Sequence, residues 1–440
     1  MTWNEFRAEA FRFALEQGCE AAETYYAASE SLQIHALGEN IDRYTVSKDG
    51  GLSLRVKLAG KDGYAYTETP EEPQALVLRA MDNARTIEVM DAHPMQVPQV
   101  YETVEDNIPA LCTLTEKELM DKALELEKLA ASLDPRVTRT ETSSVAVGRG
   151  TVEIHNTLGL AASRSGSEAQ CMTIPVGKDG DEVKVNGAFR SGEEAADVEA
   201  CAKEAVENVV SCFGAKPVAS GKWRVLLRND AAASLLRGFS GMFSAEEAQK
   251  GASLLAGKEG EVIAAPCVTI TDDPFHKRAP QAFDDEGTCC VTKNVVDGGV
   301  LTTLLHNLKT AVKAGCESTG NGIRASAASP VSVGTTNFYV KPGDTDFDAL
   351  LEKLGDGLVI TDLEGLHAGL NPISGDFSLK AEGYRVEGGK RTVPVGQITV
   401  GGNFLALLKS VEVVGSDLRF TFGGTGSPSL LIPEIMVAGE

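Results

Sequence analysis

The sequence predicts an α+β protein, with a duplicated N-terminal module of helices and antiparallel sheet followed by a β-rich, barrel-like C-terminal domain with helices. Three observations support this prediction. Apolar residues in the first half recur at helical spacing, as at Phe6, Ala10 and Phe13. Between the helices, Leu52 and Leu54 alternate with polar residues, as in a strand that buries one face. Beyond residue 221, short apolar runs separated by Gly, Asp and Asn are typical of a sheet that curves on itself.

The first half is predicted to contain one module twice, each copy being a four-strand meander between two helices. The tetrapeptide Gly-Lys-Asp-Gly occurs at 60–63 and again at 177–180, although a coincidence of common turn residues is the alternative explanation. Each helix is expected to begin with a capping box, in which Ser or Thr and a later Glu satisfy the first backbone amides. The boxes are Thr2-x-x-Glu5, Thr69-x-x-Glu72 with Pro70 at the first helical position, Thr115-x-x-Glu118 and Ser191-x-x-Glu194. Turns are expected at Asp49-Gly50, Asp62-Gly63 and Asp179-Gly180.

The length of 440 residues favours two or three domains, because single hydrophobic cores stop growing well below that size. Changes in composition and periodicity predict the boundaries. The predicted segments are an N-terminal α+β module at 1–93, a connector at 94–110, a second α+β module at 111–220 and a β-rich domain at 221–440.

Composition excludes several classes of function. With 41 basic and 63 acidic residues, the net charge of −22 repels nucleic acid and anionic membrane surfaces. The chain begins without a basic region followed by an apolar core, and no stretch approaches the ~18 apolar residues of a membrane span. Nine scattered cysteines without Cys-x-x-Cys spacing are typical of reduced thiols. We therefore expect a cytoplasmic protein without direct nucleic-acid or membrane partners.

No local motif for a metal or a nucleophile stands out. The six histidines are dispersed, and no two are closer than 30 residues, so a zinc site would have to be assembled by tertiary contacts. The sequence also contains no Gly-x-Ser-x-Gly elbow and no phosphate-binding Gly-x-x-x-x-Gly-Lys run.

Two acidic segments with a histidine between them are stronger candidates for chemistry. Carboxylates and an imidazole in one pair of loops could hold a divalent cation or polarise a substrate amide. The alternative is that these acids cap turns and pair with Lys277 and Arg278. The candidate residues are Asp272, Asp273, His276, Asp285 and Glu286.

Several motifs together resemble those of the TldD/PmbA family, also described as modulators of DNA gyrase, over almost the entire chain. The most specific is Asn-Pro-Ile-Ser-Gly-Asp-Phe-Ser at 371–378, followed by Glu382-Gly383-Tyr384, which is similar to the signature hairpin of the family. Supporting motifs are Gly51-Leu52-Ser53-Leu54-Arg55-Val56, Asn156-Thr157-Leu158-Gly159, Phe283-x-Asp285-Glu286-Gly287, Ser318-Thr319-Gly320-Asn321 and Gly401-Gly402-Asn403. The resemblance implies two related subunits that associate into a cytoplasmic peptidase acting on unfolded or small peptides.

The resemblance also locates the zinc site of the catalytic subunit. There, a helix after the first strand of the last domain carries His-Glu-x-x-x-His, and a Cys near the carboxyl end completes the site. The corresponding positions here are Arg237, Gly238 and Met242, and the segment 420–426 contains no Cys. A protonated guanidinium cannot ligate zinc, and glycine has no carboxylate with which to activate water. The pattern matches the PmbA (TldE) side of the family, so we expect no metal in this chain.

The resemblance implies a non-catalytic subunit of a TldD/TldE-type metalloprotease. Its partner would be a TldD-like catalytic subunit, which supplies the zinc, or a second copy of itself, and its ligand would be a peptide. The candidates for a peptide groove are His367, Asn371 and Asp376, around the signature hairpin. Two alternatives stay open: an autonomous peptidase with a non-standard metal site at the acidic segments, and a homodimeric peptide-binding protein without catalysis.

Overall fold

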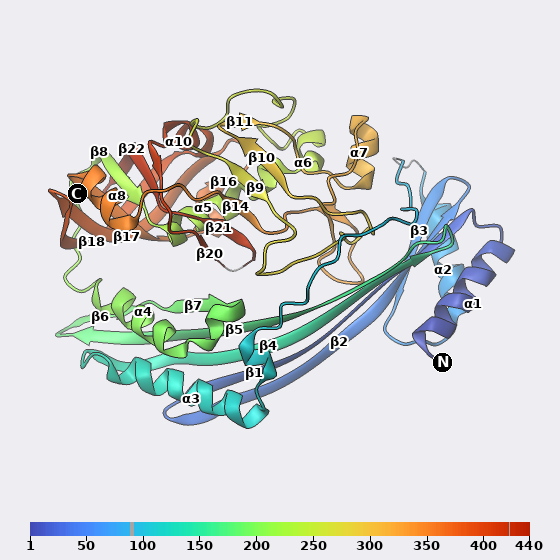
Figure 1. The fold of residues 1–440 in the computed structure, drawn as a ribbon, viewed down its shortest axis with the longest axis horizontal. Coiled ribbons are helices and arrows are strands. Elements are labelled where there is room, and N and C mark those ends of the chain that lie inside the picture. Colours follow the sequence, from blue (N-terminus) through green and yellow to red (C-terminus); the bar gives the residue numbers. More distant parts are fainter. Residues whose placement is uncertain (89–91, 422) are drawn as a thin grey trace.

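The computed structural model of the chain describes residues 1–88, 92–421 and 423–440. The N-terminal half forms one long, curved antiparallel sheet that lies along the C-terminal half (Figure 1). Its strand order is β3-β2-β1-β4-β5-β6, and β7 also pairs with β5. The strands are β1 (Ala21–Leu37), β2 (Asn40–Leu58), β3 (Lys61–Thr67), β4 (Val137–Asn156), β5 (Ala161–Asp179), β6 (Glu182–Val185) and β7 (Ala188–Ser191).

The two predicted copies of the module share this sheet. Helices α1 and α2 enclose β1 to β3, and α3 and α4 enclose β4 to β7, so the same order of elements occurs twice. The copies are joined by antiparallel pairing of β1 with β4, with Ala27 opposite Val152. The duplicated arrangement is therefore confirmed, as two halves of one sheet with a helix pair at each end (Figure 1). The helices are α1 (Trp3–Glu16), α2 (Pro73–Thr86), α3 (Glu116–Ser132) and α4 (Val198–Val210), with short 3-10 helices η1 (Ala110–Thr113) and η2 (Gly192–Ala196).

Two of the four predicted capping boxes are confirmed. They are Thr2 with Glu5 at α1 and Thr115 with Glu118 at α3. The other two do not form. Helix α2 begins at Pro73, because a residue before proline is disfavoured in the helical region, and Glu72 adopts a left-handed φ of 54°. Helix α4 begins at Val198, where the Asp197 side chain accepts the capping hydrogen bond.

One of the three predicted turns joins two strands: Asp179-Gly180 lies between β5 and β6, and Gly180 has a φ of 59°. The prediction was wrong for Asp49-Gly50, which lies inside β2 because the β1 ladder continues past it with Gly50 opposite Ala28. It was also wrong for Asp62-Gly63 in β3, since the turn is made by Ala59-Gly60 with φ values of 50° and 74°. The first copy therefore has three strands where four were predicted.

The C-terminal half contains a closed five-stranded barrel, which confirms the barrel-like prediction. Its strands follow the order β15-β8-β22-β18-β17, and β17 pairs again with β15, so the ring has no free edge. The barrel strands are β8 (Gly221–Leu227), β15 (Gly357–Glu364), β17 (Asp376–Glu387), β18 (Lys390–Asn403) and β22 (Leu430–Ala438), with short additions at β16 (Leu370–Asn371) and β19 (Val413–Val414).

A second sheet with the order β11-β10-β9-β14-β21-β20 lies beside the barrel, and α5 packs between them in the largest apolar core. Its strands are β9 (Ile270–Asp272), β10 (Lys293–Asp297), β11 (Val300–Leu301), β14 (Phe338–Val340), β20 (Arg419–Phe420) and β21 (Thr425–Ser427), and a separate pair is β12 (Gly322–Ile323) with β13 (Ser332–Val333). The helices are α5 (Asn229–Phe239), η3 (Ser240–Phe243), α6 (Ala245–Gln249), α7 (Leu308–Ala314), α8 (Phe347–Leu354), α9 (Leu366–Gly369) and α10 (Phe404–Ser410). No helix in the described parts of the chain has the length and apolar character needed to cross a membrane.

Candidate functional site

Helix α5 carries Arg237 and Gly238, the first two residues that the resemblance aligns with the zinc motif. Its apolar face is buried in the core, so Arg237 and Gly238 lie on the more exposed face. A Cβ atom placed on Gly423 would lie 3.9 Å from Cδ of Arg237. The structure thus brings α5 next to the carboxyl-terminal segment 420–426, of which Phe422 lies outside the described residues.

Gly238 is covered by the chain that leads into the signature hairpin. A Cβ atom on Gly238 would lie 2.2 Å from Cδ1 of Leu370 and 3.8 Å from Cδ2 of Leu366. The shorter separation is far inside van der Waals contact, which for two carbon atoms is optimal at about 3.5 to 4.0 Å. Leu370 therefore occupies the volume in which a side chain at this position would begin, and a glutamate there requires Leu370 to move.

Met242 faces the core and not an open site. The α-helix ends at Phe239, and the chain tightens into η3, which turns Met242 inward. Its exposed fraction is 1%, and its carbonyl accepts a hydrogen bond of 2.6 Å from Ser253 Oγ. The buried side chain of Met242 and the exposed side chain of Arg237 therefore cannot contact the same bound ion or molecule.

The residues at these positions do not fit a zinc ion. Zinc sites in proteins use three or four ligands drawn from Cys, His, Asp and Glu. Arg237 offers donors and no lone pair, Gly238 has no side chain, and Met242 is buried. Among residues 1–88, 92–421 and 423–440, no three His, Cys, Asp or Glu side chains are grouped as a metal site requires.

The signature hairpin is held together by its own polar side chains. Asn371 Oδ1 accepts hydrogen bonds from the amides two and three residues later, at 3.1 and 3.2 Å. Asp376 accepts hydrogen bonds from Asn403 Nδ2 (3.0 Å) and Ser374 Oγ (2.7 Å), which lower the pKa of its carboxyl group. His367 is exposed on α9. Asn371 and Asp376 thus stabilise a turn that packs on α5 through the leucine over Gly238.

Among the acidic candidates, Asp272 and Asp273 have structural partners. Asp272 is fully buried, and its Oδ2 accepts hydrogen bonds from Lys293 Nζ (2.9 Å) and Asn321 Nδ2 (2.8 Å). Its Oδ1 accepts from the backbone and hydroxyl of Thr336, at 2.7 and 3.0 Å. Asp273 caps a turn by accepting from the amide two residues later, at 3.1 Å. The oxygens of Asp272 are therefore engaged by protein donors.

His276 turns toward aromatic rings. Its imidazole centroid lies 4.7 Å from that of Phe420 and 5.7 Å from that of Tyr339, and burial lowers its pKa. Its Nδ1 accepts a hydrogen bond of 3.3 Å from the backbone amide of Arg278. His276 therefore serves the packing of this loop.

Asp285 and Glu286 connect the C-terminal domain to the N-terminal half. Asp285 Oδ1 accepts hydrogen bonds from Arg164 Nη2 (2.7 Å) in β5 and Tyr25 OH (3.0 Å) in β1. Glu286 Oε1 lies 2.6 Å from His93 Nε2. The side chains that make these contacts are nearly inaccessible to solvent, except that of Arg164. These acids thus form an interdomain contact, separate from the group around Asp272.

Burial shifts the protonation of this contact. It raises the pKa of Asp284 to about 8 and the pKa of Glu286 to about 7. Burial, followed by the guanidinium of Arg55, lowers the pKa of His93 to about 3. At neutral pH, a neutral imidazole therefore faces a carboxyl group that readily holds a proton. Arg55 retains its charge because it pairs with buried Asp62 at 2.7 Å.

A groove of about 940 Å³ lies beside this contact, between the sheet and the C-terminal domain. Its floor includes Gly150 and Gly166, and a Cβ atom on Gly166 would meet nothing within 4 Å. Connector residues between 101 and 107 cover one side, and segments 278–283 and 324–327 form the C-terminal wall. His367, Asn371 and Asp376, the candidates near the signature hairpin, lie outside this groove.

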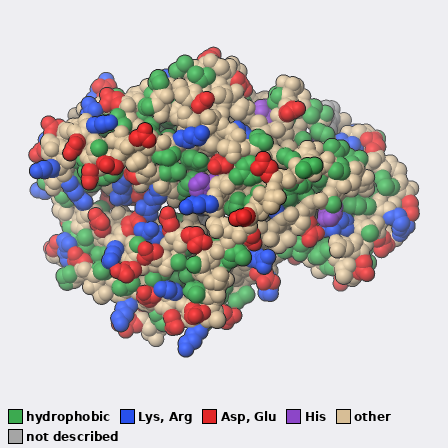
Figure 2. Space-filling model, viewed as in Figure 1, with side chains coloured by type: hydrophobic (Ala, Val, Ile, Leu, Met, Phe, Trp, Pro, Cys, Tyr) green, Lys and Arg blue, Asp and Glu red, His purple; other side chains and the backbone are tan. Residues whose placement is uncertain are grey.

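Acidic and basic side chains are mixed over the molecular face in Figure 2.

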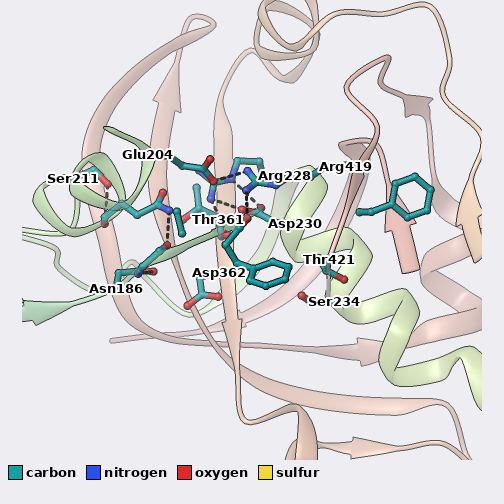
Figure 3. Close-up of a pocket in the computed structure, with 15 residues that line it drawn as sticks. Asn186, Glu204, Ser211, Arg228, Asp230, Ser234, Thr361, Asp362, Arg419 and Thr421 are labelled. Atoms are coloured by element: carbon teal, nitrogen blue, oxygen red, sulfur yellow. Dashed lines mark hydrogen bonds and ion pairs between the residues drawn. The ribbon is translucent and has the colours of Figure 1, made fainter. Parts of the chain in front are cut away.

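A smaller pocket of about 210 Å³ lies at the amino-terminal end of α5, facing α4 (Figure 3). Its charged groups are largely paired within the protein: Arg228 with Asp230 at 2.5 Å, and Arg419 with Glu204 at 2.5 Å. Asp362 also lines the pocket, and burial, with the repulsion of a neighbouring glutamate, raises its pKa to about 6. The pocket is therefore a second polar contact between the two halves.

Comparison with known proteins identifies the family. Sequence profiles described as PmbA/TldA metallopeptidase domain 1, central domain and C-terminal domain match residues 22–84, 110–213 and 220–439. The chain belongs to the TldD/PmbA family. The resemblance carried by the sequence motifs is thereby confirmed.

TldD/PmbA relatives match this chain over nearly its whole length. The Escherichia coli O157:H7 protein named Metalloprotease PmbA is 25% identical, over 98% of this chain and 96% of its own. A Methanothermobacter thermautotrophicus protein named Metalloprotease is 27% identical, over 97% of both chains. A Thermotoga maritima crystal structure, described as a candidate modulator of a DNA gyrase, has a TM-score of 0.92 and 33% identity, covering 99% of this chain and 100% of that one. TldE from Thermococcus kodakarensis has the same fold, with a TM-score of 0.90 and 22% identity over 99% of this chain and 100% of its own.

Sequence reasoning missed most residues of the interdomain contact in this TldD/PmbA member. His93 and Glu286 are separated by 193 positions, and Tyr25 and Asp285 by 260. No local spacing can reveal such pairs, and the one available signal was the run of acids before Gly287. The contact had to be found in the folded chain.

The alternative explanation of the acids is right about turn capping, as at Asp273, but wrong about the ion pairs. Asp272 pairs with Lys293 and Asp285 with Arg164, where Lys277 and Arg278 were expected. The reason is that β9 pairs with β10, which places Lys293 directly opposite Asp272. Arg278 instead lines the large groove.

Proposed function

We propose that this TldD/PmbA family member is a non-catalytic, PmbA/TldE-like subunit of a two-subunit metalloprotease. The observation that carries the proposal is the packing of Leu370 against Gly238, where the family's catalytic glutamate would lie. The adjacent ligand position holds Arg237, so neither of these two positions offers a metal ligand or a general base.

A TldD-like subunit would supply the zinc and the water-activating base, and this chain would help to enclose the peptide. The groove of about 940 Å³ supports this role, because it is at the upper end of the about 300 to 1,000 Å³ that pockets for drug-sized ligands usually have. The chain keeps the family fold but has no metal ligands at the positions aligned with the zinc motif. This combination fits the role of a partner subunit, since related subunits commonly pair about a two-fold axis. We propose that this assembly is cytoplasmic, because the nine scattered cysteines are typical of reduced thiols.

The test uses the chain alone, a TldD-like subunit alone, and the two purified together. An unstructured fluorogenic peptide is offered to each, with and without a chelator. We expect cleavage that requires the TldD-like subunit, is increased by this chain and is abolished by the chelator. A complex in which one metal-binding histidine of the TldD-like subunit is replaced is the matched control and should be inactive. Robust chelator-sensitive cleavage by the isolated chain would contradict the proposal.

The groove also supports a second candidate, a self-associating peptide-binding protein without catalysis. This function predicts saturable peptide binding to a homodimer that a TldD-like subunit leaves unchanged. Light scattering coupled to size exclusion, with and without that subunit, separates the two candidates.

The acidic residues give little support to an autonomous peptidase, because the fold divides them between two networks and His276 faces aromatic rings. Metal analysis provides the check. Stoichiometric metal that is lost in the Asp285→Ala variant would restore that alternative.

A further inference from the structure

The C-terminal wall of the large groove is positively charged. It consists of residues 278–283 and 324–327, and its charged side chains are those of Arg278 and Arg324. On the other side, the connector and the sheet contribute six acids, including Glu168, against two arginines, Arg149 and Arg164. The groove is therefore polarised across its width, in a chain whose net charge is −22.

Arg278 is held in place but has no carboxylate partner. Its guanidinium carbon lies 5.8 Å from the ring centroid of Phe420. Its Nε is buried without a hydrogen-bond partner, and no carboxylate oxygen in the described residues lies within 4.0 Å of its guanidinium nitrogens. Glu168 on the groove floor acts on its charge from a greater distance.

Arg324 has the same character. Its guanidinium carbon lies 4.7 Å from the ring centroid of Tyr25, and its Nη1 donates a hydrogen bond of 2.9 Å to the Ser329 carbonyl. Its Nε is also buried without a partner. In contrast, Arg164 in the same groove is paired with Asp285 at 2.7 Å. The two arginines of the C-terminal wall thus keep donors available.

An arginine in this state favours an anionic ligand. A partly desolvated guanidinium without a counter-ion is unfavourable, and a carboxylate relieves the cost through paired, charge-assisted hydrogen bonds. Stacking on an aromatic ring fixes the plane of the guanidinium, so less side-chain entropy is lost on binding. A polyanion such as nucleic acid is opposed by the net charge of the chain, whereas a single carboxylate on a peptide is not.

The position of Arg278 links the groove to the altered zinc helix. A Cβ atom on Gly424 would lie 3.5 Å from Arg278 Nη1, and one on Gly423 would lie 3.9 Å from Arg237 Cδ. The same glycine turn therefore separates the groove arginine from the arginine that replaces the first zinc-binding histidine. A carboxylate bound by Arg278 would lie on the side of the groove that approaches α5.

We propose that Arg278 and Arg324 bind carboxylate groups of an extended peptide in this groove, so that the chain selects acidic peptides or holds a peptide by its carboxyl terminus. The inference rests on the proposed function in one respect, namely that the ligand is a peptide. It does not depend on where the zinc is located.

The test measures peptide binding by fluorescence anisotropy, with the full chain alone and in complex with a TldD-like subunit. The probes are a labelled unstructured peptide with two glutamates, a matched peptide with glutamines, and carboxyl-terminally amidated forms of both. We expect loss of the relevant carboxylate to weaken binding about ten- to a hundredfold, as for hydrogen bonds to a charged group. Sensitivity to the Glu-to-Gln change identifies side chains as the source, and sensitivity to amidation identifies the terminus.

Variants of the chain complete the test. Arg278→Gln and Arg324→Gln should remove the preference for the carboxylate, Arg278→Lys should keep part of it, and Arg79→Gln on the exposed face of α2 is the matched control. If the Gln variants do not fold, the four peptides on the native chain decide the question. Equal binding of all four peptides, or no binding of any of them to either preparation, would overturn the inference. Cleavage by the isolated chain would instead contradict the proposed function, so the two failures are distinguishable.

Discussion

Removing Asp285 should open the contact between the C-terminal domain and the sheet. The Asp285→Ala variant leaves the Arg164 guanidinium without its ion partner at 2.7 Å, and the hydroxyl of buried Tyr25 without its acceptor at 3.0 Å. It also removes the acceptor for the backbone amide of Arg324, at 2.8 Å. All three donors would have to find water or remain unpaired.

The expected loss is about 3 kcal/mol. Breaking a buried ion pair by removing one partner costs about 3 to 5 kcal/mol. The lower end applies because Arg164 is 23% exposed and also donates to the Phe283 carbonyl, so water and that bond satisfy part of its guanidinium. The isosteric Asp285→Asn variant keeps one acceptor oxygen and should lose about 1 to 2 kcal/mol.

Native-state hydrogen exchange measures this local opening better than global unfolding, because a chain with several domains is not expected to unfold in one step. Exchange should accelerate in peptides that contain Tyr25 and residues 283–288, and less elsewhere. Asp344→Ala, at an exposed acid of the same domain, is the control and should change stability by less than about 0.5 kcal/mol. If Asp285→Ala and Asp344→Ala exchange alike, the contact does not hold the domains together as argued.

Three further variants test other parts of the structure. Gly238→Glu should destabilise the chain by about 1 kcal/mol, because overlap with Leu370 costs about 1 to 3 kcal/mol and the loss of a glycine inside a helix offsets about 0.5 to 1 kcal/mol. Leu370→Ala in the same chain should recover part of the loss of thermal stability, and a melting temperature of Gly238→Glu at or above that of the native chain would refute the packing argument. Because burial raises the pKa of Glu286 from 4.5 to about 7, the folded state holds a proton that the unfolded chain has released in this range, so stability should fall as pH rises from about 4.5 to about 7 and level off above it. Glu286→Gln should flatten this dependence in thermal melts, and an unchanged slope would assign it elsewhere. Asn403→Ala removes the cap of α10 and the hydrogen bond to Asp376, so it should cost about 1 kcal/mol and speed exchange in the signature hairpin, whereas native exchange rates would exclude this role.

The features that could be predicted from the sequence are those set by neighbouring residues. Helical spacing and the boxes beginning at Thr2 and Thr115 predicted two helix starts correctly, because capping involves residues three positions apart. Alternation of apolar residues predicted strands and a curved C-terminal sheet. The prediction failed at Asp49-Gly50, where a turn dipeptide is paired inside a long strand, since the β1 ladder satisfies its backbone.

For the candidate site, the sequence by itself determined the chemistry that Arg237 and Gly238 lack, because a guanidinium has no lone pair for zinc and glycine has no side chain in any fold. The tertiary structure alone decided that Leu370 fills the space above Gly238 and that Arg278 faces a groove. It also decided that Asp285 and Glu286 join the two halves of the molecule. These contacts unite residues up to 260 positions apart, and their existence depends on how complete sheets pack, which no short segment of the chain encodes.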